Sequence, residues 1–382
     1  MRVAIVRTTL HKGSGQTIHI RELAKRLVNR GLKVQVFVRE AMEDLSPINV
    51  SKVEFAGSSV PFLRHFGFMA RSGKLLRDFD LVHTQYHPDI FAGNFTRVLS
   101  DVPHVFTFHG YAPIRGWANP IQKLKMFDHV LGTMIALQDG VDEVIAISRY
   151  TKRILAGFYG LDNQKITLIY NGVDTERYRP NIDGSSLRKK YRIPDGPLVL
   201  YVGRMDPYKG VQYLLKAVPI VLGDIPSAKF VIAGGSRFDQ VRLPDITKSN
   251  RMREALIFTG YVPENDMPSL YATCDVFCYP STWEGFGLTP AEAQASAKPV
   301  IAFDNCAIPE VVKSGETGIL VRSKDHVALG KAIVTLLKDS ELRQRMGQEG
   351  RRRVQRLFSW DLAVEKTIEV YRRVIQSEGR FD

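Results

Sequence analysis

Short runs of apolar, β-branched residues alternate with amphipathic helical patterns along the first half of the chain. We predict strands at Val3–Val6, Lys33–Val38, Asp80–His83, His104–Phe108, Glu143–Ser148 and Lys165–Tyr170. Helical periodicity lies between several of them, notably at Ile18–Arg30 and Ile121–Leu137. Alternation of this kind indicates parallel βα units, in which helices cover both faces of a sheet.

The second half shows the same architecture with a different sequence. Its predicted strands are Leu198–Val202, Lys229–Ala233, Ile257–Thr259, Val276–Tyr279, Pro299–Phe303 and Gly318–Val321. Between the two sets, Asn171–Pro197 is rich in Asn, Asp, Gly, Pro and Ser, and we interpret it as the interdomain connection. The chain ends in three helical patterns, at Val327–Leu337, Glu341–Phe358 and Asp361–Ile375. Because 382 residues exceed one ordinary core, we predict two domains.

Composition limits the class of protein without identifying it. Apolar residues make up 44% of the chain and charged residues 24%, as in a soluble globular protein. The cysteines Cys274, Cys278 and Cys306 form neither a disulfide framework nor a zinc-ligand pattern, so we expect buried thiols in a reducing compartment. Residues 1–20 lack a signal-peptide pattern, and no run approaches the ~18 apolar residues that span a bilayer. We therefore expect a cytoplasmic protein.

The chain is strongly basic, with a net charge of +13. This excess attracts polyanions in general, namely nucleotides, nucleic acids and anionic membranes. Charge alone does not choose among them. No nucleic-acid-binding motif accompanies it, so we predict no nucleic-acid partner.

A turn joins the apolar run Val276–Pro280, which contains the predicted strand Val276–Tyr279, to the predicted helix Ala291–Ala297. Gly285 and Gly287 flank Phe286 in this turn, where glycine allows the backbone to approach a ligand or to adopt positive φ. The turn is the first candidate for a binding site.

The helix after this turn carries start signals. Thr289, Pro290 and Glu292 predict an N-cap hydroxyl, a proline at the first helical position and a capping glutamate. Such an N-terminus presents unpaired N–H groups to an anion. Glu284, just before the turn, is costly beside phosphates unless it faces neutral hydroxyls, and a phosphate-linked sugar offers both groups. Taken alone, Glu284 could equally be a loop charge and Glu292 only a cap.

Two cations follow another predicted strand. Arg204 ends the run that starts at Val199, and Lys209 lies in the turn Met205–Gly210. Both belong to the carboxyl end of a strand, where ligands bind in open parallel sheets. Their presence favours the functional interpretation of the two glutamates.

At this point the chain resembles the retaining glycosyltransferases of family 4, which have the two-domain GT-B fold. The matching residues are Gly203-Arg204 with Lys209-Gly210, Glu284 and Glu292, Ala233-Gly234-Gly235, Phe258-Thr259-Gly260-Tyr261-Val262, Asn171-Gly172-Val173-Asp174 and Phe108-His109-Gly110. The resemblance implies α/β architecture: two Rossmann-like, doubly wound parallel-sheet domains facing a central cleft. On this basis we assign residues 1–172 to the acceptor-side domain, 197–357 to the nucleotide-sugar domain, and 358–382 to a helix crossing back to the first domain.

The first domain contributes two candidate sites. The loop His11–Thr17 contains Gly15 and leads into a helix, so its N–H groups can approach a phosphate or an acceptor. It matches neither the dinucleotide fingerprint nor a P-loop. The family has two adjacent glycines here, whereas this chain has Ser14-Gly15. His109 follows a predicted strand, and the resemblance implies contact with the transferred sugar; a structural histidine is the alternative.

The resemblance implies a reaction: a sugar moves from a UDP- or GDP-linked donor to an acceptor hydroxyl, with retention at the anomeric carbon. The implied catalytic residues are His109, Glu284, Arg204 and Lys209. The implied donor-binding residues are Gly15, Arg204, Lys209, Tyr261, Val262, Gly285, Phe286, Gly287, Leu288 and Glu292. Arg204 and Lys209 would neutralise the departing diphosphate, Glu284 would face the sugar and Glu292 the ribose hydroxyls. We predict no metal and no cofactor apart from the donor.

The acceptor is less defined by the sequence. Pro61–Phe79 interleaves basic and apolar residues, as in a segment at a membrane surface, although an ordinary amphipathic helix has the same pattern. Tyr111–Pro120, with Arg115 and Trp117, is a second candidate for acceptor contact. With the net charge, these favour a lipid-linked acceptor and peripheral contact with an anionic membrane. The alternatives are a soluble sugar-phosphate acceptor, or a nucleotide-sugar epimerase or hydrolase of GT-B fold.

Overall fold

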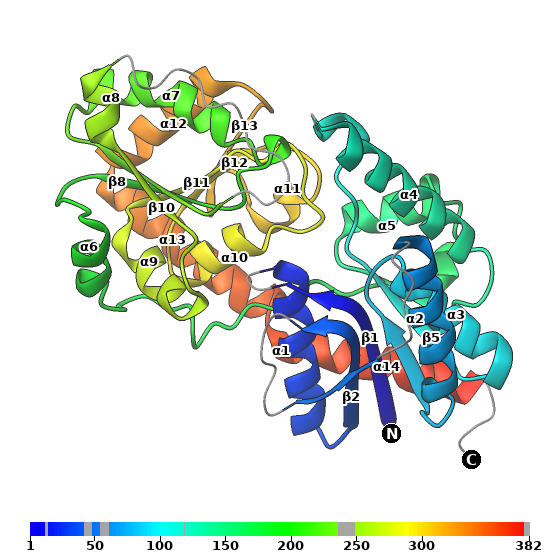
Figure 1. Cartoon of the computed structure of the whole chain (residues 1–382). Coiled ribbons are helices and arrows are strands. Elements are labelled where there is room, and N and C mark those ends of the chain that lie inside the picture. The colour runs from blue at the N-terminus through cyan, green and yellow to red at the C-terminus, as the bar shows by residue number, and fades with distance from the viewer. Residues whose placement is uncertain (12–13, 42–47, 54–60, 118, 236–248, 378–382) are drawn as a thin grey trace. The chain divides into compact units, whose positions relative to one another are not determined.

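The computed structural model describes residues 1–11, 14–41, 48–53, 61–117, 119–235 and 249–377. The chain forms two compact units (Figure 1). The first comprises Met1–Tyr111, Lys125–Gly172 and Trp360–Asp382, and the second comprises Ala112–Leu124 and Val173–Ser359. Among the helices built by the described residues, none combines the length and apolar character required to cross a membrane.

The first unit is built on a parallel sheet whose seven described strands have the order β3-β2-β1-β4-β5-β6-β7. Their bounds are β1 (Arg2–Leu10), β2 (Lys33–Ala41), β3 (Asn49–Lys52), β4 (Leu81–Thr84), β5 (His104–Phe108), β6 (Glu143–Ala146) and β7 (Ile166–Leu168). The six predicted strands are confirmed within a few residues. The edge strand β3 was not predicted, because Asn-Val-Ser-Lys has too few apolar residues to signal a strand.

Alternation along β1 gives this sheet two buried faces. Val3 and Ile5 pack in one core cluster with residues of α1 and α14, while Ala4 and Val6 pack in another with Phe37 and other residues. The helices are α1 (Gly15–Asn29), α2 (Pro61–Leu76), α3 (Asp89–Ser100), α4 (Pro120–Ala136), α5 (Arg149–Gly157) and α14 (Trp360–Ser377), with the 3₁₀ turn η2 (Asn163–Lys165). The 3₁₀ turn η1 (Ile114–Gly116) belongs to the second unit. Helix α4 begins among residues that cluster with the second unit and continues in the first.

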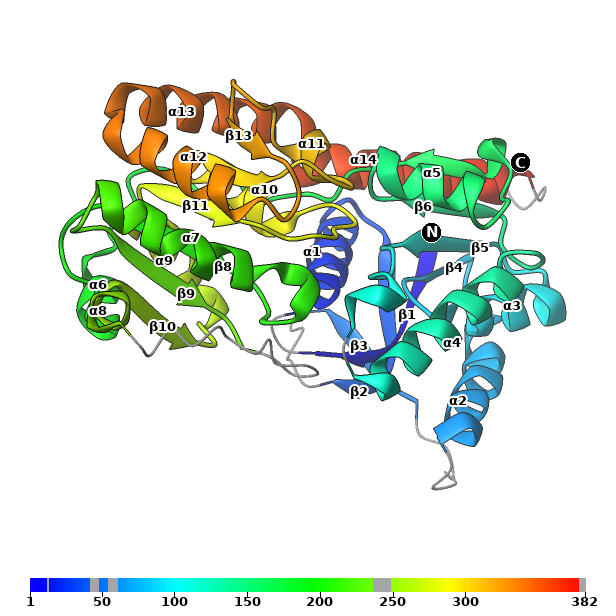
Figure 2. The ribbon, with the colours of Figure 1, turned by 90° about the horizontal axis from the view of Figure 1, so that it is seen from above.

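The second unit repeats the topology with six described strands in the order β10-β9-β8-β11-β12-β13, all parallel. They are β8 (Leu198–Val202), β9 (Lys229–Ala233), β10 (Leu256–Gly260), β11 (Val276–Tyr279), β12 (Val300–Phe303) and β13 (Gly318–Val321). The helices are α6 (Ser185–Tyr191), α7 (Val211–Asp224), α8 (Asn250–Ala255), α9 (Met267–Thr273), α10 (Leu288–Ala295), α11 (Ile308–Val311), α12 (His326–Lys338) and α13 (Ser340–Leu357). Two 3₁₀ turns, η3 (Pro207–Lys209) and η5 (Glu264–Asp266), follow strand ends. Helices lie on both faces of each sheet (Figure 2), so the predicted fold class is confirmed.

The predicted interdomain connection Asn171–Pro197 needs correction. From Val173 onward it is a folded part of the second unit: the Val173 N–H bonds to the Phe358 carbonyl at 2.7 Å, and α6 packs on α9 with Leu187 buried. Its Asn, Asp, Gly, Pro and Ser residues form turns and helix ends within the unit, which is why the composition resembled a linker.

In both units the strand order reverses once, between β1 and β4 and between β8 and β11. Connections leave in opposite directions at such a point, which opens a crevice at the carboxyl ends of these strands, where open α/β sheets bind ligands. The fold therefore directs attention to the segments that follow β8 and β11, and β1 and β4.

Candidate functional site

The segments after β8 and β11 lie against each other. Gly210 ends the turn after β8 with φ of 74°, and a Cβ on it would lie 1.7 Å from the carbonyl oxygen of Pro280, directly after β11. Only glycine permits this approach. As a result, Lys209 Nζ lies 2.5 Å from Glu284 Oε1, so the structure brings together two residues that the sequence predicted for one site.

Tyr279, the last residue of β11, completes this pair. Its hydroxyl donates to Glu284 Oε1 at 2.7 Å and accepts from Lys209 Nζ at 3.1 Å. Burial and the nearby Glu284 carboxylate raise the pKa of the Tyr279 phenol well above its usual range, so it remains a donor. Among the described residues, Glu284 Oε2 has no hydrogen-bond partner and is the oxygen available to a ligand. The sequence missed Tyr279, because a tyrosine in an apolar run resembles core.

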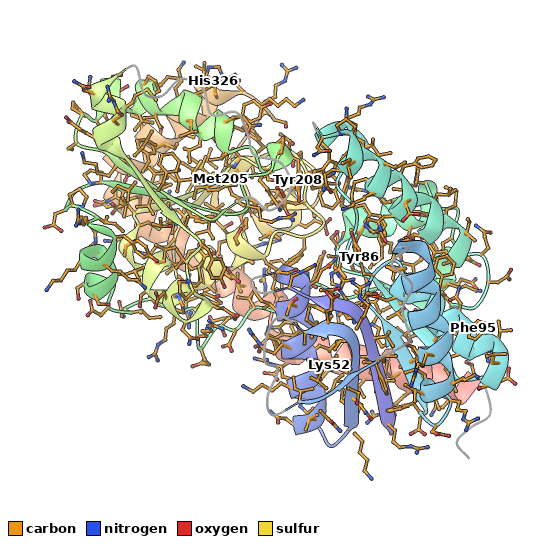
Figure 3. All side chains as sticks on the ribbon, viewed as in Figure 1. Lys52, Tyr86, Phe95, Met205, Tyr208 and His326 are labelled. Carbon is orange, nitrogen blue, oxygen red and sulfur yellow. The ribbon has the colours of Figure 1, made fainter. Side chains whose placement is uncertain are left out.

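Arg204 is held beside this pair. Its Nε lies 3.1 Å from Asp206 Oδ2, and its Nη2 donates to the Tyr208 hydroxyl. Lys209 Nζ lies 5.2 Å from the centre of the same Tyr208 ring, which is labelled in Figure 3. Tyr208 thus links the two predicted phosphate-binding cations, and Asp206 fixes the guanidinium. Asp206 and Tyr208 lie between the two cations in the sequence. The sequence patterns predicted Arg204 and Lys209 as site residues but not these two partners.

The predicted N-cap of α10 is wrong. The helix begins at Leu288 with Gly287 as N-cap, so Thr289 and Pro290 lie inside its first turn. Gly287 has φ of 109°, a conformation open mainly to glycine, and this starts the helix earlier than the Thr-Pro signal suggests. The Phe286 side chain is buried on Phe358, with ring centroids 5.3 Å apart, which leaves its backbone as the part able to contact a ligand.

Glu292 belongs to a separate polar cluster. It accepts a hydrogen bond from the Tyr271 hydroxyl at 2.7 Å and lies near Arg177 and Tyr178. Burial raises its pKa from 4.5 to about 7, against the opposing effect of these neighbours. A half-protonated carboxyl near neutral pH suits hydrogen bonding to neutral hydroxyls. Arg177 and Tyr178 were missed because they lie in the supposed linker.

The residues that follow β10 lead to the polar cluster around Glu292. Val262 is buried and Tyr261 is half-exposed, and the next residues lead to Glu264. Glu264 Oε1 pairs with Arg177 Nη1 at 2.7 Å. The predicted base-pocket residues therefore adjoin the Glu292 cluster, although their contact with a base stays a prediction.

The first unit places polar side chains at its own strand ends. His109, after β5, has its Nε2 3.0 Å from Gln85 Oε1, and its ring meets His19 edge-on at 5.0 Å. Burial holds the pKa of His109 well below its usual range, with a smaller contribution from the nearby basic side chains His19, Arg7 and His83, so the imidazole is neutral. It can exchange hydrogen bonds with hydroxyls but does not supply positive charge.

The loop after β1 carries the other predicted site. Gly15 is the first residue of α1, and Lys12 and Gly13 lie outside the described residues. Arg7 in β1 pairs with Asp89 at 3.0 Å and donates a hydrogen bond to Gln16 Oε1 at 2.9 Å. Its guanidinium lies 4.4 Å from the ring centre of Tyr86, a residue that is labelled in Figure 3. The hydrophobic pattern did not predict Arg7 as a site residue, because Arg7 lies inside an otherwise apolar strand.

In the loop proposed for acceptor contact, the Trp117 ring is buried and meets the Tyr208 ring at 5.2 Å within the second unit, so it does not offer a free face to an acceptor. Arg115 is exposed, and its contact with an acceptor stays a prediction. Pro61–Leu76 is helical, as one of the two interpretations held, and packs on α3. Several of its apolar and basic side chains lie outside the described ones.

The chain is similar to known families and proteins. A family model described as "Glycosyltransferase Family 4" matches residues 13–177, and one described as "Glycosyl transferases group 1" matches residues 184–353. The chain is 28% identical to a D-inositol 3-phosphate glycosyltransferase of Kineococcus radiotolerans, across 96% of this chain and 92% of that protein. It is 33% identical to a GDP-mannose-dependent α-(1-6)-phosphatidylinositol monomannoside mannosyltransferase of Mycobacterium tuberculosis, across 61% and 62% of the two chains.

Solved structures share the fold. HepE of Anabaena in complex with UDP-glucose superimposes with a TM-score of 0.79 at 19% identity, covering 97% of this chain and 99% of that one. Together with the two family models, which between them span most of the chain, this likeness leaves one conclusion. The chain belongs to glycosyltransferase family 4 and has the GT-B fold.

Proposed function

We propose that this glycosyltransferase moves a sugar from a UDP- or GDP-linked donor to an acceptor hydroxyl with retention and without a metal ion. The observation that carries the proposal is the contact of Lys209, Tyr279 and Glu284 at the strand ends where β8 and β11 diverge. A cation and a carboxylate held together there suit a ligand that joins phosphate to hydroxyl groups. The family relationship supports the same class of donor, as do the names of two similar proteins, a GDP-mannose-dependent mannosyltransferase and HepE in complex with UDP-glucose.

In this mechanism, residues of the second unit stabilise the charges that develop on the diphosphate and on the sugar. Arg204 and Lys209 bind the diphosphate and neutralise the charge that develops as it leaves, assisted by the N–H groups of Gly285–Leu288. Glu284, oriented by its two partners, directs Oε2 to the sugar and stabilises the oxocarbenium-like transition state. Glu292 accepts from the ribose hydroxyls, while Tyr261 and Val262 line the base pocket.

The first unit contributes hydrogen bonds. His109 contacts a hydroxyl of the transferred sugar as a neutral imidazole, and Gly15 presents its N–H to the donor or the acceptor. The acceptor proton passes to the leaving phosphate, so no separate protein base is needed.

A thermal-shift panel tests the donor site. Nucleoside diphosphates and their sugars are added to the protein in EDTA, and binding raises the melting temperature by mass action. We expect selective stabilisation by uridine or guanosine diphosphates. Absence of a shift with every nucleotide would contradict the proposal, and conversion of the donor to an epimer or to free sugar as the sole product would favour the alternative enzymes.

Tyr279 should act as a positioning residue. Tyr279→Phe retains the ring, which stacks between Phe277 and Tyr201, but removes the hydrogen bond to Glu284. We expect turnover to fall about tenfold, because a hydrogen bond to a charged group contributes ~1.5 kcal/mol or more. Donor affinity should change little, since the hydroxyl contacts Glu284 and not the nucleotide.

The matched control for this variant is Tyr213→Phe on α7, which removes a hydroxyl from a ring packed on Phe303 outside the site. Steady-state kinetics on the three proteins separate turnover from KM. Equal turnover for Tyr279→Phe and the control would remove Tyr279 from the mechanism.

We also propose a lipid-linked acceptor and peripheral contact with an anionic membrane. In the first unit, α4 exposes Phe127, Leu131 and Ile135, at 53%, 45% and 58% of their surface, at four-residue spacing. Side chains at this spacing form one stripe along a helix. The neighbouring α3 exposes Val98 and Leu99, and Asn94 of α3 donates to the Ala136 carbonyl of α4 at 2.8 Å.

Apolar side chains exposed in one stripe differ from the singly scattered ones that are normal on globular proteins, and we propose that this stripe is an interaction site. Exposed Lys123 and Lys125 lie on the same helix and add attraction to anionic headgroups. The Mycobacterium tuberculosis relative is named for a phosphatidylinositol monomannoside, which supports a lipid-linked acceptor over a soluble sugar phosphate.

Liposome co-sedimentation tests the membrane contact. Phe127→Ser/Leu131→Ser should lower partition onto vesicles with anionic lipid by tenfold or more, because each buried apolar side chain contributes ~1.5 kcal/mol. Val28→Ser on α1 is the control, since Val28 is 45% exposed and α1 covers the opposite face of the same sheet. No binding by the parent, or equal loss with Val28→Ser, would contradict this surface.

A further inference from the structure

The first unit holds a group of metal-ligating side chains outside the site described above. His87 follows β4, and Asp128 and His129 lie on α4. One potential ligand atom from each residue lies within 4.8 Å of the other two. Among the residues that the structure describes, these three form a group of side chains able to hold a metal ion. His87 Nδ1 lies 2.9 Å from His129 Nδ1 and 4.0 Å from Asp128 Oδ2.

Both imidazole rings are held in place by packing. The His129 ring stacks on Tyr111 at 5.6 Å with an interplanar angle of 13°, and it meets Tyr86 edge-on at 5.0 Å. His87 is 6% exposed and its ring meets Phe91 at 5.7 Å. A Cβ at position 132 would lie 2.0 Å from His87 Nε2, so the space for this ring depends on Gly132. Ligands fixed in this way lose little freedom when an ion binds.

The contact between the two Nδ1 atoms brings two ring nitrogens to one location, where one of them donates a hydrogen bond to the other. We propose that this location binds a divalent transition-metal ion of the Zn²⁺ type, with His87, His129 and Asp128 as ligands. In a tetrahedral zinc site with Zn–N bonds near 2.0–2.1 Å, the two nitrogens lie about 3.3 Å apart. To bind one ion, the two nitrogens must move apart by a few tenths of an ångström and both rings must turn so that their lone pairs converge on the ion. Asp128 is exposed on the helix surface and can rotate to complete the set.

The ligand chemistry selects the class of ion. Two imidazoles and one carboxylate favour Zn²⁺, Co²⁺, Ni²⁺ or Cu²⁺ over Mg²⁺ and Ca²⁺, which prefer oxygen ligands. Three protein ligands leave a further position for water. The site is separate from the donor site, where no metal is predicted, and it does not depend on the proposed reaction.

Binding would clamp α4 to the segment that follows β4. His87 belongs to that segment and is two residues from Gln85, the partner of His109, while His129 stacks on Tyr111, two residues beyond His109. The ion would thereby stabilise the strand ends that carry the predicted sugar contact, without entering the chemistry itself.

Cobalt titration of the untagged, EDTA-stripped protein tests the site. We expect visible d–d absorption of bound Co²⁺ that saturates at one ion per chain and disappears when Zn²⁺ displaces the Co²⁺. Binding should weaken as pH falls, because protons compete with the ion for both imidazoles. Zn²⁺ should also raise the melting temperature of the protein. His129→Gln should weaken binding by about a hundredfold or more, and Asp128→Asn, an exposed change that does not threaten folding, by about tenfold.

Two controls exclude other binding sites. His326→Gln removes a histidine of the second unit (labelled in Figure 3), and Cys306→Ser removes the partly exposed thiol. Neither should alter affinity. Absence of saturable cobalt absorption, or binding unchanged by both His129→Gln and Asp128→Asn, would overturn the proposal.

Discussion

Replacing Glu284 with Gln should lower turnover by about 10²–10³-fold, the loss seen when one preorganised electrostatic contact to a transition state is removed. Gln has the same shape and can still accept hydrogen bonds from Lys209 and Tyr279, which in the structure hold Oε1 at 2.5 and 2.7 Å. It lacks the negative charge that stabilises the oxocarbenium-like centre. Release of nucleoside diphosphate measures the effect.

The substitution also leaves the Lys209 charge without its ionic partner in a largely buried position. Circular dichroism must therefore show that the variant is folded at the assay temperature. Glu316→Gln, an exposed glutamate in the loop before β13, is the matched control and should retain the parent rate. Full turnover by Glu284→Gln would remove this carboxylate from the mechanism.

Replacing Glu292 with Gln should weaken donor binding yet stabilise the protein at alkaline pH. Burial raises the pKa of Glu292 in the folded state from 4.5 to about 7, although the hydrogen bond from Tyr271 opposes this change. Between these values the folded state keeps a proton that the unfolded state has lost. The free energy of unfolding therefore falls as pH rises from 4.5 to about 7. Above this range the buried carboxylate lowers the free energy of unfolding by the full amount, roughly 3 kcal/mol. Gln carries no such penalty.

The measurement is melting temperature against pH for the parent, Glu292→Gln and the control Glu316→Gln. The Glu292→Gln variant should exceed the parent at pH 8 and approach it near pH 4.5, whereas the control difference should stay constant. Donor affinity should fall by about tenfold or more in the variant, since hydrogen bonds to a charged acceptor contribute ~1.5–3 kcal/mol. A pH-independent stability difference with unchanged donor affinity would exclude the assigned role.

Periodicity predicted most of the fold because buried parallel strands are continuous apolar runs. Strands such as β8, β9 and β11 match their predicted bounds, while the polar edge strand β3 carries too few apolar residues to be recognised. The start of α10 was misplaced because the Thr-Pro signal competes with Gly287, whose positive φ sets the turn. Such a conformation depends on tertiary packing that residue spacing does not reveal.

The site was predicted in outline. Strand ends marked Lys209 and Glu284, which are in contact, but the hydroxyl that orients Glu284 belongs to Tyr279, a residue with the pattern of core. The cluster around Glu292 draws Arg177 from a stretch whose composition resembled a linker. Long-range partners of this kind follow from the order of strands in the sheet, which local sequence patterns do not encode.

The most direct test of the proposed function is the anomeric configuration of the product, measured by proton NMR. The protein is incubated in EDTA with an α-linked UDP- or GDP-sugar that stabilises it. The acceptor is a hydroxyl compound that the enzyme uses, or water as a slow acceptor. Spectra are recorded before the product undergoes mutarotation. The proposed mechanism predicts release of nucleoside diphosphate and an α-configured product. A β-configured first product, or release that requires added metal, would contradict it.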